Sequence, residues 1–308
     1  MDGILNINKP PHKTSFSVVK RIKQLTGERR VGHAGTLDSA ATGVLPVCLG
    51  QGTRVVEFLL NASKIYQADI SLGVATDTYD ATGSITQRSD CSDITQEQLE
   101  AELNAFIGSV SQTPPMYSAV KYHGQRLCEL ARAGITVERK SRLAQIYRVE
   151  LLEWQPPVAS IIVECGKGTY IRSLAHDLGQ SLGCGAHLKN LVRLKYGPFH
   201  ISSAVSLSQF EDAVHQGYWQ HLVHPLDTVL LHWAAVIISD EASQAVRNGQ
   251  PLILSDGCPK PDRSGSASAD RLCRAYTHNG YFLGVLRYNP SKGHWQPEKI
   301  FARSPAGV

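Results

Sequence analysis

Residues 65–74 read Ile-Tyr-Gln-Ala-Asp-Ile-Ser-Leu-Gly-Val, so apolar and polar side chains alternate along the whole stretch. This period of two is typical of a β-strand with one face in a core and one face in solvent, because successive side chains point to opposite sides. The stretch therefore predicts a half-buried strand, with Tyr66 pointing toward the interior.

Helices and further strands are predicted on both sides of this strand. Apolar residues at helical spacing follow the N-cap candidate Thr14 and end at Gly27, which predicts a first helix. Thr95 and Gln98 form a capping-box pattern ahead of a second helix that Gly108 closes. Other predicted elements are strands at 143–152 and 160–165 and a helix at 173–182. Because strands and helices mix without strict βαβ alternation, we expect an α+β fold: a mixed, largely antiparallel sheet flanked by helices.

The last third of the chain has a different character. Beyond residue 200, 9 basic residues balance 9 acidic residues, and residues 255–270 are rich in Ser, Gly, Asp and Pro. Residues 281–286 look like a strand of a compact β-rich unit that begins near residue 235. We therefore expect two domains, at 1–234 and 235–308.

Composition excludes several classes of protein. No apolar run approaches the length of a membrane span, and the N-terminus lacks the pattern of a secretory signal, so we expect a cytoplasmic protein. The seven cysteines are scattered and never spaced as Cys-x-x-Cys, which is typical of reduced thiols. His215, His221 and His224 come closest to metal-ligand spacing, but nothing completes the set, so no metal is predicted. The phosphate-binding GxxxxGK[ST] loop and the Gly-x-Ser-x-Gly elbow are both absent.

Charge is distributed unevenly along the chain, although the net charge is only +4. Residues 1–68 hold 9 Lys or Arg against 4 Asp or Glu, 121–148 hold 7 against 2, and 165–200 hold 5 against 1. Residues 69–112 hold 1 against 8. Three basic blocks on a common face would follow a phosphate backbone, whereas blocks on unrelated faces would be only solvated charge. Both arrangements fit the sequence at this point.

Residues 32–38 (Gly-His-Ala-Gly-Thr-Leu-Asp) form a glycine-punctuated turn that carries one carboxylate, Asp38, into a basic neighbourhood. An isolated acid in such surroundings is a candidate nucleophile. The alternative is structural, because Asp also favours the N-cap of a helix and Ser39 to Ala41 follow it.

A second candidate segment, residues 166–172, leaves the predicted strand at 160–165 through two glycines. If it stays extended, Tyr170 and Arg172 face the same side. An aromatic ring beside a guanidinium suits a nucleobase and a carboxylate, since Arg binds Asp in a bidentate, charge-assisted pair. The alternative is a surface tyrosine and an arginine at the start of a helix.

These and other segments together resemble one family. The matching stretches, in chain order, are 3–10 (GILNINKP), 31–38 (VGHAGTLD), 41–46 (ATGVLP), 76–83 (TDTYDATG), 114–121 (PPMYSAVK), 168–175 (GTYIRSLA) and 188–199. They resemble the bacterial TruB-type tRNA pseudouridine synthases, which isomerise uridine 55 in the T-loop of tRNA. Residues 282–300 resemble, less specifically, the family's small C-terminal RNA-binding module of PUA type.

The resemblance implies a pseudouridine synthase fold, no cofactor, and roles for three residues. Asp38 corresponds to the catalytic aspartate, which either attacks C1′ of the ribose or removes the C2′ proton. Tyr66 corresponds to the active-site tyrosine, as base for the C5 proton, and Arg172 to the partner of Asp38.

The resemblance also implies how substrate is bound. A base stacked inside the T-loop must be extruded, and His33 corresponds to the residue that fills the vacated space. Tyr170 would stack on the target base and Leu191 would contact it. Lys9 and Lys121, in two matched stretches, are expected to bind substrate. We expect a monomer that binds the tRNA T-arm without an obligate protein partner or a membrane.

The chain departs from the family at four positions. Tyr79 replaces the usual Gly, Thr82 a frequent Glu, Cys128 an aromatic residue and Val192 a frequent Arg. Two other functions are kept as alternatives: an RNA-binding folding assistant in which catalysis is secondary, and a guide-RNA-dependent relative that needs partner proteins. None of the four departures removes a proposed catalytic group.

Overall fold

The computed structural model describes residues 1–253 and 272–301. Its helices and short 3-10 turns are α1 (Ser15–Thr26), η1 (Gly50–Arg54), α2 (Val56–Leu60), α3 (Gln96–Ala105), α4 (Leu127–Arg132), α5 (Ile171–Ser181), η2 (Ile201–Ser203), α6 (Leu207–His215), η3 (Trp219–Leu222), η4 (Leu226–Leu230) and α7 (Asp240–Arg247). In this part of the chain, no helix is long and apolar enough to cross a bilayer.

The strands form one large sheet and three small ones. The large sheet contains β1 (Gly3–Lys9), β2 (Val31–His33), β3 (Thr42–Leu49), β4 (Lys64–Leu72), β7 (Gly108–Gln112), β10 (Arg142–Gln155), β11 (Val158–Cys165), β12 (Ala186–Tyr196), β13 (Phe199–His200), β14 (Val205–Ser206) and β15 (Val223–His224). The small sheets are β5 (Val74–Thr76) with β6 (Ile85–Arg88), β8 (Lys121–Tyr122) with β9 (Gln125–Arg126), and the four strands β16 (Ala235–Ile238), β17 (Leu272–Thr277), β18 (Phe282–Asn289) and β19 (His294–Ile300).

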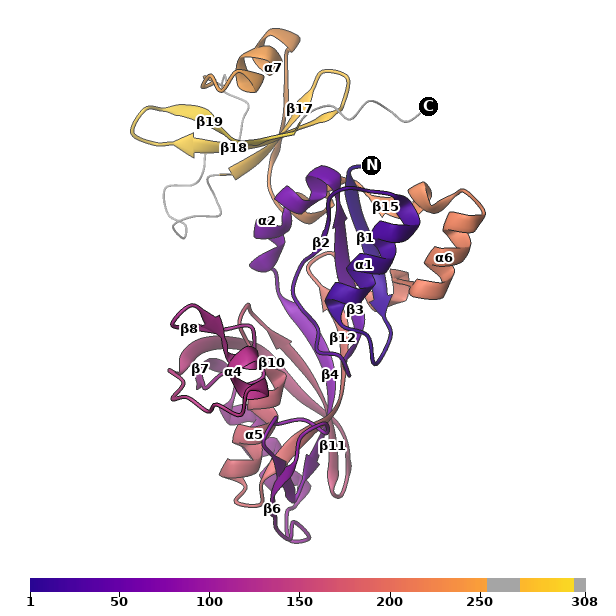
Figure 1. Cartoon of the computed structure of the whole chain (residues 1–308). Coiled ribbons are helices and arrows are strands. Elements are labelled where there is room, and N and C mark those ends of the chain that lie inside the picture. Colours follow the sequence, from indigo (N-terminus) through magenta and orange to yellow (C-terminus); the bar gives the residue numbers. More distant parts are fainter. Residues whose placement is uncertain (254–271, 302–308) are drawn as a thin grey trace.

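The large sheet is mixed, as predicted. Its main path runs β14-β1-β3-β12-β4-β11-β10-β7. The β1/β14 and β3/β12 pairs are parallel, and the other pairs along this path are antiparallel. The long strand β12 joins the two halves, because it pairs with β3 on one side and β4 on the other. Figure 1 shows β1–β3 with α1 and α6 in the middle of an elongated molecule, and β4, β10 and β11 with α5 at one end.

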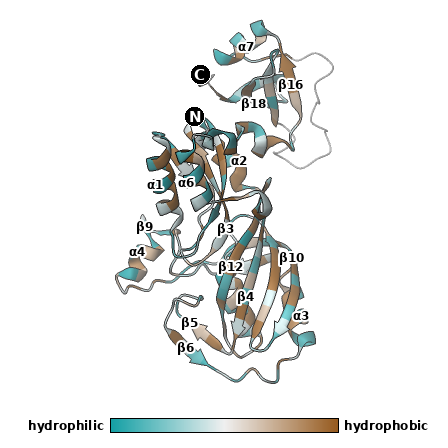
Figure 2. Cartoon of the chain, turned by 90° about the vertical axis from the view of Figure 1, so that its right-hand side faces the viewer, coloured by the Kyte–Doolittle hydropathy of each residue, from teal (hydrophilic) through white to brown (hydrophobic). Residues whose placement is uncertain are grey.

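Strand β4 confirms the alternating pattern at 65–74. From Lys64 to Leu72 every second residue is buried, and Tyr66 is 8% exposed. The strand ends at Leu72 instead of Val74, because Gly73 adopts a φ of +81°, outside the range of a strand. The buried face packs under α3 and α5, and brown hydrophobic segments run along β4 and β10 in Figure 2.

The predicted helices are present, and their ends follow local hydrogen bonds. Thr14 caps α1, and Gly27 ends it in the left-handed conformation. The capping box of Thr95 and Gln98 is formed at α3, which ends at Ala105, before Gly108. Helix α5 begins at Ile171 and not at the predicted residue 173. The residues at 39–41 form no helix.

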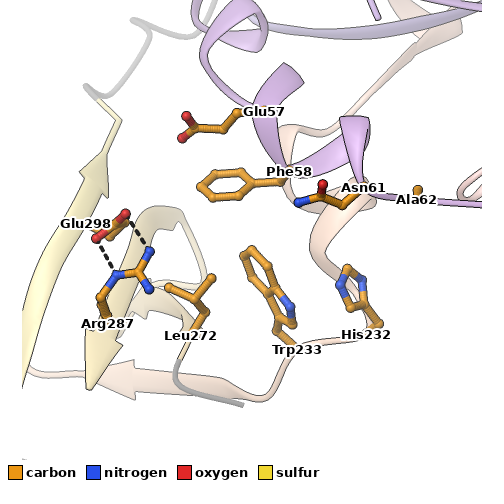
Figure 3. Close-up of a pocket in the computed structure, with 9 residues that line it drawn as sticks. All are labelled: Glu57, Phe58, Asn61, Ala62, His232, Trp233, Leu272, Arg287 and Glu298. Atoms are coloured by element: carbon orange, nitrogen blue, oxygen red, sulfur yellow. Dashed lines mark hydrogen bonds and ion pairs between the residues drawn. The ribbon is translucent and has the colours of Figure 1, made fainter. Parts of the chain in front are cut away.

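The C-terminal β-rich domain is also confirmed. Strands β16–β19 form a sheet of their own, covered by α7 (Figure 1), and the stretch at 281–286 contributes to β18. Arg54 donates to the Ile300 carbonyl, and Lys299 pairs with Glu57, so this domain docks on η1 and α2. A cavity of about 420 Å³ lies at the junction, with Phe58 edge-on to Trp233 (Figure 3). The predicted Ser/Gly/Asp/Pro loop at 255–270 lies outside the described residues.

Candidate active site

Asp38 lies on the loop that connects β2 to β3, and tertiary contacts hold this loop. The Ser15 hydroxyl donates to the Leu37 carbonyl at 3.0 Å and accepts from the Leu37 amide at 2.9 Å. Lys9 Nζ donates to the Ser39 carbonyl at 3.1 Å. Because no helix follows Asp38, its interpretation as a helix cap is wrong.

Arg172 binds Asp38 side-on, through both carboxylate oxygens. Nε lies 2.9 Å from Oδ2, and Nη2 lies 3.0 Å from Oδ1. The Arg172 side chain is only 6% exposed, whereas that of Asp38 is 45% exposed. A buried cation therefore orients an acid that still reaches solvent, as a reacting carboxylate requires.

Arg172 reaches this position from a helix and not from an extended strand. Tyr170 is the extended N-cap residue of α5 and Arg172 lies in the first turn, so the segment does not stay extended and Arg172 is an arginine at the start of a helix, as in the alternative interpretation. The buried Gln112 side chain accepts from the Tyr170 amide at 3.0 Å and donates to its carbonyl at 3.3 Å. A distant side chain thus defines where α5 begins.

Asp80 is a second carboxylate at Arg172, and the sequence reasoning did not single it out. Its Oδ2 lies 3.5 Å from Arg172 Nη1. Its Oδ1 accepts from the Thr78 hydroxyl at 2.7 Å and from the amide and hydroxyl of Thr82. The run Thr78-x-Asp80-x-Thr82 was the available signal, since short polar side chains at this spacing close local turns.

The surroundings of Asp38 raise its pKa above the ordinary carboxyl value. The main cause is that the protein atoms packed around the carboxylate displace part of its water, although one edge of the side chain stays exposed, and the negative charge of Asp80 adds to it. Arg172 and Lys9 act in the opposite direction and lower the pKa. The carboxylate is therefore a stronger base than a free aspartate.

Tyr66 lies near Asp38, next to a buried arginine that the sequence reasoning also missed. Burial raises the pKa of the Tyr66 hydroxyl, whereas Arg193, which lies opposite Tyr66 in the β12/β4 pair, acts to lower it. Arg193 is 1% exposed and donates to the carbonyls of Val44 at 2.6 Å and Gly35 at 3.0 Å. Arg193 thus links β12, opposite Tyr66, to β3 and to the loop that carries Asp38. Its position in a basic block was the only sequence signal.

Three other proposed substrate-binding residues are Leu191, His33 and Lys121. Leu191 on β12 pairs in register with Ala68 of β4 and packs against the core that contains Tyr66. His33 ends β2. Its Nδ1 is buried and has no hydrogen-bond partner in the part of the chain that the structure describes, and burial lowers the pKa of its imidazole. Lys121 is exposed on β8.

Lys9 differs from its expected role. Its side chain is fully buried, and Nζ donates to the carbonyls of Pro10 at 2.9 Å, Lys13 at 2.6 Å and Ser39 at 3.1 Å. Burial lowers the pKa of Lys9 to about 8. With its three donors engaged, the ammonium organises the Asp38 loop instead of contacting substrate directly.

A basic cavity of about 380 Å³ is lined by residues on both sides of the segment that contacts Arg172. Its lining is Pro114, Val120, Lys121, Tyr122, His123, Leu127, Glu138, Arg139, Lys140 and Arg142. The same chain segment touches the site, because the Tyr117 carbonyl accepts from Arg172 at 2.9 Å and the Thr113 carbonyl from Ser173 at 2.8 Å. The segment at 113–117, which borders this cavity through Pro114, therefore contacts the first turn of the helix that carries Arg172.

The departures at Thr82, Cys128 and Val192 leave these contacts in place. Thr82 supplies two donors to Asp80. The Cys128 amide in α4 donates to the Ser118 carbonyl, and Val192 pairs with Thr42 in β3. Within residues 1–253 and 272–301, no group of three or more His, Cys, Asp or Glu side chains is placed to hold a metal ion.

Comparison with known proteins places this geometry in a family. The family model for the TruB pseudouridylate synthase N-terminal domain matches residues 23–171, and that for the tRNA pseudouridylate synthase B C-terminal domain matches residues 172–231. The chain belongs to the TruB family. The second family model begins at Arg172, whose ion-pair partner Asp38 lies in the region matched by the first model.

Full-length relatives and solved structures agree with this assignment. The chain is 44% identical over 301 residues to tRNA pseudouridine synthase B of Dehalococcoides mccartyi, covering 98% of this chain and 97% of the relative. It is 38% identical over 285 residues to that of Clostridium kluyveri, covering 92% and 95%. A chain of a Cbf5–Nop10–Gar1 complex matches with a TM-score of 0.70 and 29% identity over 97% of this chain and 81% of that chain. A chain of an H/ACA RNP bound to a substrate RNA containing 2′-deoxyuridine matches with a TM-score of 0.72 and 26% identity over 98% and 85%.

Proposed function

We propose that this TruB-family enzyme isomerises uridine 55 in the T-loop of tRNA to pseudouridine, with Asp38 as the catalytic carboxylate. The observation that carries the proposal is the side-on ion pair of Asp38 with the buried Arg172. The names of the relatives support tRNA as substrate.

The reaction needs few groups, because product and substrate are isomers. The N1–C1′ bond of uridine breaks, the uracil turns, and a C5–C1′ bond forms, while the C5 proton leaves and N1 gains one. Asp38 either attacks C1′ or removes the C2′ proton to release the base, and its raised pKa suits both roles. Arg172 keeps the carboxylate ionised and aimed at the ribose. Tyr66 accepts the C5 proton in its phenolate form, which the positive charge of Arg193 favours against the effect of burial.

Binding completes the proposal. The target base leaves the T-loop stack, with His33 filling its place, Tyr170 stacking on it and Leu191 contacting its ring. Lys121 and the basic cavity bind phosphates of the T-arm, which position the RNA without reading its sequence. In this proposal a catalytic domain at 1–234 is followed by a PUA-like RNA-binding domain at 235–308. The protein works as a cytoplasmic monomer.

The test is release of tritium from a tRNA transcript that carries 5-tritiated uridine, because the C5 hydrogen is lost only if the base rejoins through C5. Wild-type protein should release one tritium per transcript, and Asp38→Asn should release none while keeping its fold. A transcript with cytidine in place of uridine 55 should release no tritium, which identifies the modified position. Near wild-type release by folded Asp38→Asn would refute the role of Asp38.

The same assay separates the two alternatives. The Cbf5 relatives were solved in complexes with other proteins, so dependence on partners is a specific rival. Release by the purified chain alone excludes it. If Asp38→Asn restores a cell lacking the protein although it releases no tritium, RNA binding is a function separate from catalysis.

A further inference from the structure

Tyr79 adopts a backbone conformation that a tyrosine rarely takes. Its φ is +64°, in the left-handed region that glycine tolerates best. Such a conformation persists only where the surrounding structure over-determines it. The contacts of Tyr79 therefore show which neighbours maintain its backbone conformation and which segments its side chain positions.

The side chain of Tyr79 stacks on His176 of helix α5. The ring centroids are 3.9 Å apart and the planes differ by 13°. Both residues are half-buried, and within residues 1–253 and 272–301 the buried Nδ1 of His176 has no hydrogen-bond partner. Burial is the main cause that lowers the pKa of His176, so a neutral imidazole lies against the phenol ring at neutral pH.

This stack is the second of two parallel contacts between one loop and one helix. Arg172 and His176 are four residues apart in α5, so their side chains lie on the same face, one turn apart. Their partners, Asp80 and Tyr79, are neighbours in the loop. The loop thus contacts α5 at two points, of which one is the guanidinium that binds Asp38.

The backbone of the loop is fixed to β12 on both sides of Asp80. The Leu188 amide donates to the Tyr79 carbonyl at 2.9 Å, and the Ala81 amide donates to the Leu188 carbonyl at 3.0 Å. On the side of α5, Arg172 Nη1 donates to the Thr78 carbonyl at 3.5 Å, and the ring stack adds a contact of the same loop one helical turn further along.

We infer that Tyr79 and His176 are positioning residues for the reaction: their stack sets the distance of Asp80 from Arg172, and through Arg172 the orientation of the Asp38 carboxylate. The inference rests on the proposed function. It predicts that the stack acts on turnover and leaves RNA affinity unchanged, since neither ring is part of the basic cavity.

Three variants test the inference in the full-length protein. Tyr79→Gly removes the ring and accommodates the positive φ, so the midpoint temperature of thermal unfolding should stay within about 2 °C of that of the wild type. Its kcat should fall about 10- to 100-fold, the range expected when a catalytic group is misplaced by roughly 1 Å, with KM within twofold. Tyr79→Phe keeps the ring and should restore kcat. His176→Ala should reproduce the loss, and adding it to Tyr79→Gly should cost nothing further.

A matched control and a readout independent of turnover complete the design. His224→Ala removes a histidine whose ring lies edge-on to Phe199, with 5.4 Å between the ring centroids. This change should leave kcat unchanged. In labelled protein, the Arg172 Nε–H signal in NMR spectra should shift in Tyr79→Gly and not in His224→Ala. Wild-type kcat in Tyr79→Gly, or an unshifted Arg172 signal, overturns the inference. Loss of stability and kcat together, unrescued by Tyr79→Phe, also overturns it, since a purely structural role gives that result. Absence of tritium release by wild type refutes the proposed function, and the NMR shift still decides the geometry.

Discussion

Asp38 and Arg172 are 134 positions apart in the chain and form a bidentate pair, with N–O distances of 2.9 and 3.0 Å. The arginine is anchored by the first turn of α5 and by the Tyr117 carbonyl, whereas the aspartate stands on a loop. The rigid partner thus orients the exposed one.

Replacing Arg172 should separate catalysis from binding. Arg172→Ala leaves Asp38 and Asp80 close together without their shared cation, so we expect kcat to fall about 1,000-fold. The Kd for tRNA should change less than about threefold, because the partner of Arg172 is a carboxylate and not a phosphate. Single-turnover tritium release and filter binding measure the two quantities. Equal losses in both would contradict this assignment.

The raised pKa of Asp38 predicts the acid limb of the pH profile. The ionised carboxylate is the active form, so kcat/KM should rise with pH through a pKa above the ordinary value of 3.8. Asp80→Asn removes a negative neighbour that raises this pKa, and the limb should move to lower pH. Asp77→Asn, an exposed change in the same loop, is the control. A limb that stays in place in Asp80→Asn would disprove the coupling.

Lys9 should matter for the loop and not for RNA contact. Lys9→Met keeps the aliphatic stem but deprives the carbonyls of Pro10, Lys13 and Ser39 of a donor. We expect a loss of about 2–3 kcal/mol in the free energy of unfolding, measured with urea, together with lower kcat. Tritium release reports kcat, and the slope of log Kd against log salt should not change. A flatter salt slope in Lys9→Met would instead support direct contact of Lys9 with the RNA, as the sequence predicted.

The basic residues near the site should give RNA binding its salt dependence. Lys140→Ala in the cavity, or changes at the exposed Lys20, Arg29 or Arg30, should weaken binding and each reduce the salt slope by about 1. Arg148→Ala is the control, because Glu150 already neutralises Arg148 at 2.7 Å. Slopes equal to wild type would argue against phosphate contacts.

Asp177 should limit stability above pH 6. Burial raises its pKa to about 6, so the folded protein binds this proton more tightly than the unfolded chain does. Stability therefore falls as pH rises from about 4 to 6. Asp177→Asn lacks this loss and should be more stable by about 1–2 kcal/mol at pH 7.5, with the difference vanishing below pH 4. Urea unfolding curves of both proteins at pH 7.5 and below pH 4 measure this difference in stability. Asp212→Asn, at an exposed position, is the control.

Local patterns in the sequence sufficed for the elements that local forces specify. Thr14 and Gly27 mark the two ends of α1, because capping hydrogen bonds join residues only a few positions apart. The alternation around Tyr66 predicted β4, because strand faces alternate whatever the neighbouring strand is. The start of α5 was missed, because its N-cap residue Tyr170 depends on Gln112, 58 positions away.

By itself, the sequence determined the helices, the alternating strands, the mixed sheet and, through its ordered motifs, the pairing of Asp38 with Arg172. Only the tertiary structure assigned Asp80 to Arg172, Arg193 to Tyr66 and Lys9 to the loop of Asp38. The physical reason is register. Strand β12 pairs with both β3 and β4, and that pairing brings together side chains whose local sequence carries no record of one another.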